Sequence, residues 1–95
     1  MATLLLRVSL TVETVANYTY IKERLIEIGF SKKIKSADGI YYRLPNGNYI
    51  IDTNYTVKEI LDKVISIVLK IDKTPQIVLT ETADKGTRWY GLSVY

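Results

Sequence analysis

The chain has 95 residues, of which 47% are hydrophobic, and this size and composition are typical of a single folded domain spanning residues 1–95. Cysteine and histidine are both absent, which argues against disulfide bonds, thiol chemistry and the usual zinc ligand sets, so we expect neither a metal nor a cofactor. The net charge of +3 and the pI of about 9.1 are compatible with a polyanionic partner and with an ordinary basic domain.

The first third of the chain predicts a strand followed by a helix. Residues 3–11 alternate between leucine or valine and more polar side chains, which is the pattern of a strand with one buried face. Between residues 14–28, apolar side chains recur at three- and four-residue steps, which indicates an amphipathic helix. Gly29 is suited to end this helix, because glycine readily adopts the left-handed conformation found just past a helix C-terminus.

The strongest local signal is the Pro-Asn-Gly sequence at residues 45–47, which lies between two short runs of aromatic and branched residues. Asn-Gly tolerates the positive φ angles of a tight turn. We therefore expect residues 40–44 and 49–53 to pair as an antiparallel hairpin. Residues 31–36 precede this hairpin, and their lysines around an isoleucine fit either an exposed strand or a basic loop.

The second half of the chain predicts a helix followed by two strands. The sequence Thr-Val-Lys-Glu at residues 56–59 is a capping box, in which the threonine and glutamate side chains bond to each other's backbone amides. A helix over residues 57–70 follows, and Pro75 marks its end because proline disfavours helical geometry before it. Residues 76–82 and 88–95 are rich in branched and aromatic side chains, which predicts two further strands.

These elements follow the order β-α-β-β-α-β with an added C-terminal strand, which is the ferredoxin-like arrangement of the α+β class. Both helices are then expected on one face of an antiparallel sheet. The other face stays open, and an open, partly apolar sheet face is often a nucleic-acid platform or a subunit interface. The added strand can pair with its own sheet or cross to a second subunit, so we expect a homodimer.

Basic side chains gather in the middle of the chain, at Lys32, Lys33 and Lys35, with Lys22 and Arg24 on the preceding helix. Phosphate binding needs long cationic side chains on one accessible surface, because binding releases counterions from the nucleic acid. The plainer interpretation is that these lysines protect a sheet edge from unwanted pairing.

Tyrosine is the dominant aromatic residue, since eight tyrosines accompany one phenylalanine, and its polar tip suits partly exposed surfaces. Aromatic rings on a sheet can stack unpaired bases, but they also anchor protein interfaces and pack across strands. Tyr41 and Tyr42 are adjacent in a predicted strand and point to opposite faces, so one of them would meet a substrate together with Arg7. The other aromatic candidates are Tyr49, Tyr55, Tyr90, Tyr95 and Trp89.

The acidic side chains lack the spacing of a metal site. Asp38 and Asp84 lie in predicted turns, and Asp52 ends a predicted strand. A metal-dependent nuclease needs carboxylates that converge on Mg²⁺. A metal-independent ribonuclease would instead use arginine, lysine and tyrosine to polarise the phosphate and a 2′-hydroxyl.

Residues 43–54 have the sequence Arg-Leu-Pro-Asn-Gly-Asn-Tyr-Ile-Ile-Asp-Thr-Asn. Together with the helix at residues 56–68 and the helix end at residues 25–31, they resemble the GhoS-type antitoxin family. This family is similar to the CRISPR-associated spacer-acquisition nucleases. The resemblance implies a small ferredoxin-like domain that binds or cleaves RNA.

The resemblance also implies where catalysis would lie. The family's functional arginine corresponds to Lys22, which keeps the positive charge but loses the planar guanidinium group. Arg24 lies nearby, so Lys22 and Arg24 are the candidate catalytic residues. Leu10 and Thr11 stand where the spacer-acquisition nucleases carry an aspartate, so the implied cleavage is metal-independent.

We therefore expect a small cytoplasmic RNA-binding homodimer that can act as an antitoxin-like endoribonuclease. Its expected RNA-binding residues are Arg7, Lys32, Lys33, Lys35, Tyr41 and Tyr42. The alternatives are a protein-binding inhibitor or interaction module from a phage or mobile element, and a metabolite-binding regulatory domain. Because no apolar run approaches the ~20 residues of a membrane helix, no membrane association is expected.

Overall fold

The computed structural model describes residues 2–82 and 91–95 and confirms the predicted α+β class. In chain order, the elements are β1 (Ala2–Ser9), α1 (Val15–Glu27), β2 (Lys33–Lys35), β3 (Tyr41–Arg43), β4 (Asn48–Thr53), α2 (Val57–Val68) and β5 (Gln76–Thr82). Within these described residues, neither helix is long and apolar enough to cross a membrane.

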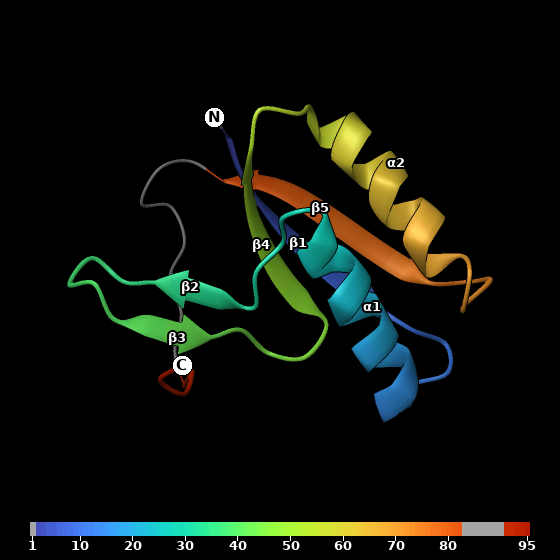
Figure 1. The fold of residues 1–95 in the computed structure, drawn as a ribbon, viewed down its shortest axis with the longest axis horizontal. Coiled ribbons are helices and arrows are strands. Elements are labelled where there is room, and N and C mark those ends of the chain that lie inside the picture. The colour runs from blue at the N-terminus through green and yellow to red at the C-terminus, as the bar shows by residue number, and fades with distance from the viewer. Residues whose placement is uncertain (1, 83–90) are drawn as a thin grey trace.

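A three-stranded antiparallel sheet in the order β4-β1-β5 forms the centre of the domain. Both helices cover the same face of this sheet (Figure 1). The even-numbered side chains of β1 point to that face, as the alternation predicts, and those of Leu4, Leu6 and Val8 are at most 2% exposed. From the helices and β4, the core receives Ile21, Leu25, Ile60, Val64, Val68, Tyr49 and Ile51.

Helix α1 ends as its sequence predicts, at a glycine. Gly29 has a φ angle of 111°, and its N–H donates to the Ile26 carbonyl at 3.0 Å. The N–H of the next residue, Phe30, donates to the Leu25 carbonyl at 3.0 Å. This pair of bonds is a Schellman motif, which satisfies carbonyls at the helix end and turns Phe30 into the core.

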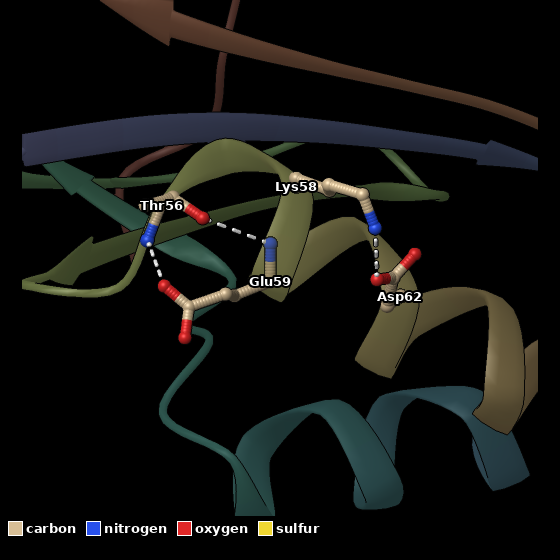
Figure 2. A network of polar contacts seen from close by, with 4 residues as sticks. All are labelled: Thr56, Lys58, Glu59 and Asp62. Atoms are coloured by element: carbon tan, nitrogen blue, oxygen red, sulfur yellow. Dashed lines mark hydrogen bonds and ion pairs between the residues drawn. The ribbon is translucent and has the colours of Figure 1, made fainter.

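Helix α2 begins with the predicted capping box (Figure 2). The Thr56 hydroxyl accepts a hydrogen bond from the Glu59 N–H at 3.1 Å, and the Glu59 carboxylate accepts one from the Thr56 N–H at 3.0 Å. Lys58 and Asp62 form an exposed ion pair on the first turns of the helix, with the ammonium 3.0 Å from the carboxylate. The start of α2 is therefore fixed by local chemistry.

The predicted hairpin between residues 40–44 and 49–53 is wrong. Strand β3 pairs with β2, while β4 pairs with β1. The turn itself is present, because the Asn48 N–H donates to the Pro45 carbonyl at 3.0 Å and Gly47 has a φ angle of 81°. This turn joins two strands that do not pair with each other, and the Gly47 carbonyl instead accepts a hydrogen bond from β1.

Strands β2 and β3 form a second, smaller sheet that extends from the edge of the central sheet (Figure 1). The two sheets are joined at Ser31, which exchanges two backbone hydrogen bonds with Ile50 of β4 at 2.8 and 2.9 Å. The region predicted as either a strand or a basic loop is therefore a short strand over Lys33–Lys35.

The end of the chain returns to this smaller sheet. Val94 lies opposite Tyr42, so the final residues run along the outer edge of β3. The predicted strand at residues 88–95 is thus described only from residue 91 onwards. Trp89 and Tyr90 lie outside the described residues.

Candidate nucleic-acid interface

Alternation along β2 and β3 separates an exposed face from a buried one. On the exposed face, Lys33 lies opposite Arg43, and Lys35 lies opposite Tyr41. Ile34 lies between the two lysines and points to the other face, where it is only 6% exposed. Three cationic side chains and one aromatic ring are therefore collected on one side of the smaller sheet.

A second ring reaches this side from the end of the chain. The Tyr95 N–H donates to the Tyr41 carbonyl at 2.8 Å, and the Arg43 N–H donates to the Ser93 carbonyl at 2.9 Å. The centroid of the Tyr95 ring lies 5.1 Å from Lys33 Nζ and 5.5 Å from Arg43 Cζ. The last segment thus adds Tyr95 to the residues of β2 and β3.

We call the five side chains Lys33, Lys35, Tyr41, Arg43 and Tyr95 the cation–aromatic face. Lys33 Nζ lies 4.8 Å from the Tyr41 centroid, and Lys35 Nζ lies 5.7 Å from the same centroid. At an exposed site, a cation–ring contact contributes about 0.5 to 1 kcal/mol. The rings therefore help to hold three like charges near one another, which makes this face a site of positive potential.

The cation–aromatic face lies on the side of the sheet away from the helices. Ile50 points to that side, because its neighbours in β4 are buried in the core beneath the helices. Ser31 is the cross-strand partner of Ile50, and Lys33 and Lys35 follow Ser31 at two-residue steps. Lys32 belongs to the opposite, helix side.

Lys32 holds the turn before β4 in place. Its ammonium group donates to the carbonyls of Pro45 at 2.9 Å and Asn48 at 3.2 Å. Burial, followed by the like charges of Lys22 and Arg43, lowers the pKa of Lys32 to about 8. Two of its three N–H donors are used by the turn, and its Nζ lies 4.8 Å from the centroid of the buried Tyr49 ring, so the main role of Lys32 is structural.

Helix α1 also lies beside this turn. Tyr18 lies one helical turn before Lys22, and a Cβ atom built on Gly47 would be 3.8 Å from the Tyr18 ring. The positive charge of Lys22 acts on Lys32, as that of Arg43 does. Positive charge therefore continues from the cation–aromatic face, past the turn that contains Gly47, to α1.

The other predicted residues lie outside the cation–aromatic face. Arg7 is exposed on β1, in the central sheet, and points to the side away from the helices, as that face does. Arg24 remains on α1, where its guanidinium group is ion-paired with Glu27. Tyr42 lies opposite Ile34 on the other face of the smaller sheet, so Tyr41 is the tyrosine that joins the lysines.

Sequence reasoning did not select Arg43 as a binding residue. Arg43 follows Tyr41 at a two-residue step, so strand alternation alone places both side chains on one face. That signal was present in the sequence. Tyr95 was one of several aromatic candidates, and only the pairing of its segment with β3 distinguishes it from the others.

Two further tyrosines have contacts elsewhere in the domain. Tyr49 is 2% exposed and meets Phe30 edge-on, with the ring centroids 6.4 Å apart. Burial, followed by the neighbouring Tyr18, raises the pKa of Tyr49 to about 12. Tyr55 is exposed, with its ring centroid 4.5 Å from Lys63 Nζ on α2.

The acidic candidates are bonded within the chain. Asp52 accepts a hydrogen bond from the Thr3 hydroxyl at 2.5 Å. Asp38 accepts one from the Ser36 hydroxyl, which lowers the pKa of that carboxyl group. Asp84 lies outside the described residues. In the part of the chain that the structure describes, no group of three or more acidic side chains is placed to hold a metal ion.

Comparison with known proteins leaves the family of this chain open. No protein-family model and no curated protein matches it. The geometry of the cation–aromatic face and the charges beside it are therefore the basis for assigning a function.

Proposed function

We propose that this chain binds single-stranded RNA through the cation–aromatic face. The observation that carries the proposal is the group of three cations and two tyrosine rings, in which each cation lies within 5.7 Å of a ring centroid. The cations would contact phosphates, and the release of counterions from the RNA would supply much of the binding free energy. The two rings would offer stacking surfaces to unpaired bases.

The exposed rings favour a single strand over a duplex. Tyr41 and Tyr95 are 43% and 58% exposed, so part of each ring is available to a ligand. Bases within an RNA duplex are already stacked and cannot reach such rings, whereas the bases of a single strand can be splayed out. The Tyr41 hydroxyl group can also bond to the 2′-hydroxyl groups that distinguish RNA from DNA.

The direct test measures the binding of a fluorescent oligouridine of about 12 nucleotides by anisotropy at several salt concentrations. If the three cations of the face contact phosphates, they should contribute about −2 to the slope of the logarithm of the affinity against the logarithm of the salt concentration. The variant Lys33→Ala/Lys35→Ala should bind about tenfold or more weakly, and its slope should be shallower by about 1.4, because two phosphate contacts are lost.

A matched control removes the same charge from another surface. Lys58 and Lys70 are exposed on α2 and in the turn after it, so Lys58→Ala/Lys70→Ala should bind the oligouridine like the parent chain. Equal weakening by both double variants would show that only net charge matters. An oligouridine affinity that changes neither with salt concentration nor in Lys33→Ala/Lys35→Ala would contradict the proposal and favour a protein-binding module.

The antitoxin-like ribonuclease activity expected from the sequence is the second part of the proposal. Lys22 lies near Lys32, whose lowered pKa of about 8 allows proton exchange near neutral pH. Cleavage of the bound RNA that persists with a chelator and weakens in Lys22→Ala would support this activity. Arg24→Ala should have the smaller effect, because Arg24 is already paired with Glu27. Intact RNA at high protein concentration would leave binding alone as the function.

The ferredoxin-like sheet order, the homodimer and the cytoplasmic location also belong to this proposal. The β4-β1-β5 order with both helices on one face supports the ferredoxin-like arrangement. The Ser31–Ile50 pairing at the β4 edge supports a fourth strand at that edge. The homodimer is supported by Val78 of the edge strand β5, which is 60% exposed and offers apolar surface to another subunit. A 10.9 kDa particle in light scattering would contradict the homodimer.

A further inference from the structure

The cation–aromatic face is built from three separate segments, and the last of them contributes one residue to it. Tyr95 contacts Lys33 and Arg43, whereas Tyr41 contacts Lys33 and Lys35. Half of the four cation–ring contacts therefore depend on the position of residues 91–95. Without this segment, the face would keep its three cations but lose one of its two rings.

The described contacts hold segment 91–95 to β3 weakly. Its backbone makes two hydrogen bonds with β3, from the Arg43 N–H to the Ser93 carbonyl and from the Tyr95 N–H to the Tyr41 carbonyl. Val94 and Tyr95 remain 67% and 58% exposed, and only Leu92 of the segment is partly buried, so little apolar surface is buried. A segment with few buried contacts and exposed backbone bonds opens at a low free energy, well below that of global unfolding.

We propose that docking of segment 91–95 on β3 and binding of single-stranded RNA to the cation–aromatic face are coupled. The coupling rests on the proposed function and describes how RNA binding is regulated. Bound RNA stabilises the docked segment, and the docked segment raises the affinity for RNA. Any condition that releases the segment would weaken RNA binding.

Electrostatics explains why the coupling is favourable. Lys33 and Arg43 lie opposite each other on neighbouring strands, and the Tyr95 ring lies close to both cations. When the segment leaves, the two cations lose the attraction of that ring, and their mutual repulsion drives the two flexible side chains apart. A phosphate placed beside them would be bound best when the ring is also present, because the ring restricts both cationic side chains to one region.

The coupling is reciprocal, which gives it two independent measurements. If docking strengthens RNA binding by a given factor, RNA must strengthen docking by the same factor. The amide protons of Arg43 and Tyr95 report docking directly, because each donates a hydrogen bond between β3 and the segment. Their exchange with deuterium, followed by NMR, should slow about fivefold or more when the 12-nucleotide oligouridine saturates the protein.

The variant Tyr95→Ala tests the ring itself, and Tyr95→Phe is its control. The alanine variant should bind the oligouridine about fivefold or more weakly and lose the RNA-dependent slowing of amide exchange at Arg43, whereas the phenylalanine variant should retain both. The Ile50 N–H bonds to Ser31 away from the segment, and its exchange should not depend on Tyr95.

The outcomes separate the coupling from the proposed function. RNA binding with unchanged exchange at Arg43 and Tyr95 would overturn the coupling and leave RNA binding intact. Absence of binding to the parent chain would overturn both. Equal affinity of Tyr95→Ala and Tyr95→Phe would also overturn the coupling, because the ring would then contribute nothing to the bound state.

Discussion

Asp72 holds together the two connections at one end of the central sheet. Its carboxylate accepts hydrogen bonds from the Thr11 N–H at 2.5 Å, between β1 and α1, and from the Thr74 N–H at 3.0 Å, between α2 and β5. The bond from the Thr74 amide, together with those from Thr11, holds the pKa of Asp72 below its usual value of 3.8. The charged form of Asp72 is therefore the form that stabilises the fold.

The acid dependence of stability follows from this shift. Because the pKa of Asp72 is lower in the folded chain than in the unfolded chain, its contribution is complete above the unfolded pKa and is lost as the pH falls through the folded pKa. Asp72→Asn should lower the free energy of unfolding at neutral pH, and the difference from the parent chain should shrink below about pH 3. Urea unfolding at both pH values measures this, and a difference that does not change with pH would contradict it.

Neighbouring lysines in β2 and just before it differ in role because a strand points successive side chains to opposite sides. Lys33 lies on the exposed cation–aromatic face, whereas Lys32 donates to the Pro45 and Asn48 carbonyls on the helix side. The sequence could predict that these residues separate, but not which side would be open. The pairing of Ser31 with Ile50 determines which side of the sheet Lys33 and Lys35 point to, because it sets the orientation of the whole strand.

The turn before β4 depends on a glycine for two reasons. Gly47 has a φ angle of 81°, which a side chain disfavours, and a Cβ atom there would lie 2.6 Å from the Val8 carbonyl oxygen. The same glycine accepts a hydrogen bond from the Val8 N–H at 2.7 Å. Close approach of the turn to β1 is thus what directs the following strand into the central sheet.

Gly47→Ala should therefore destabilise the fold more than conformational strain alone would. The matched control is Gly39→Ala, because Gly39 has a similar φ angle of 87° but its added Cβ would meet only the flexible end of Lys35, at 3.9 Å. Both variants should lose about 1 to 2 kcal/mol to left-handed strain, and Gly47→Ala should lose at least about 1 kcal/mol more from the backbone collision. Urea unfolding at neutral pH compares them, and equal losses would contradict the role assigned to Val8.

The helices could be predicted from the sequence because their ends are determined by neighbours in the chain. Thr56 and Glu59 cap α2 across three residues, and Gly29 ends α1 with bonds that reach back only a few residues. Strand pairing is different, since the Pro-Asn-Gly turn specifies a reversal of the chain but not the partner of the strand that follows. That partner is β1, more than 40 residues earlier, and only packing against the core selects it.

The candidate site unites residues that are far apart in the sequence. The two lysines of β2 were predicted as a group because they are neighbours in the chain, and Tyr41 was one of two tyrosines between which the sequence could not choose. Tyr95 joins them only because segment 91–95 pairs with β3. Arg7, which was expected to join them across an open sheet face, points to the same side of the molecule from the central sheet. The sequence therefore indicated that lysine and tyrosine side chains form the candidate site, but not which distant residues join them.

The continuation of positive charge to α1 predicts how the site should respond to RNA length. Lys22 belongs to α1 on the helix side of the sheet, whereas the cation–aromatic face is on the other side, so only a longer strand can contact both. For an oligouridine of about 12 nucleotides, Lys22→Ala should reduce the salt slope by about 0.7, the value for one phosphate contact, whereas binding of about 4 nucleotides should be unchanged. Lys70→Ala serves as the control for net charge. An equal effect of Lys22→Ala on both lengths would mean that Lys22 acts through the general field of the protein, and the strand would then end at the cation–aromatic face.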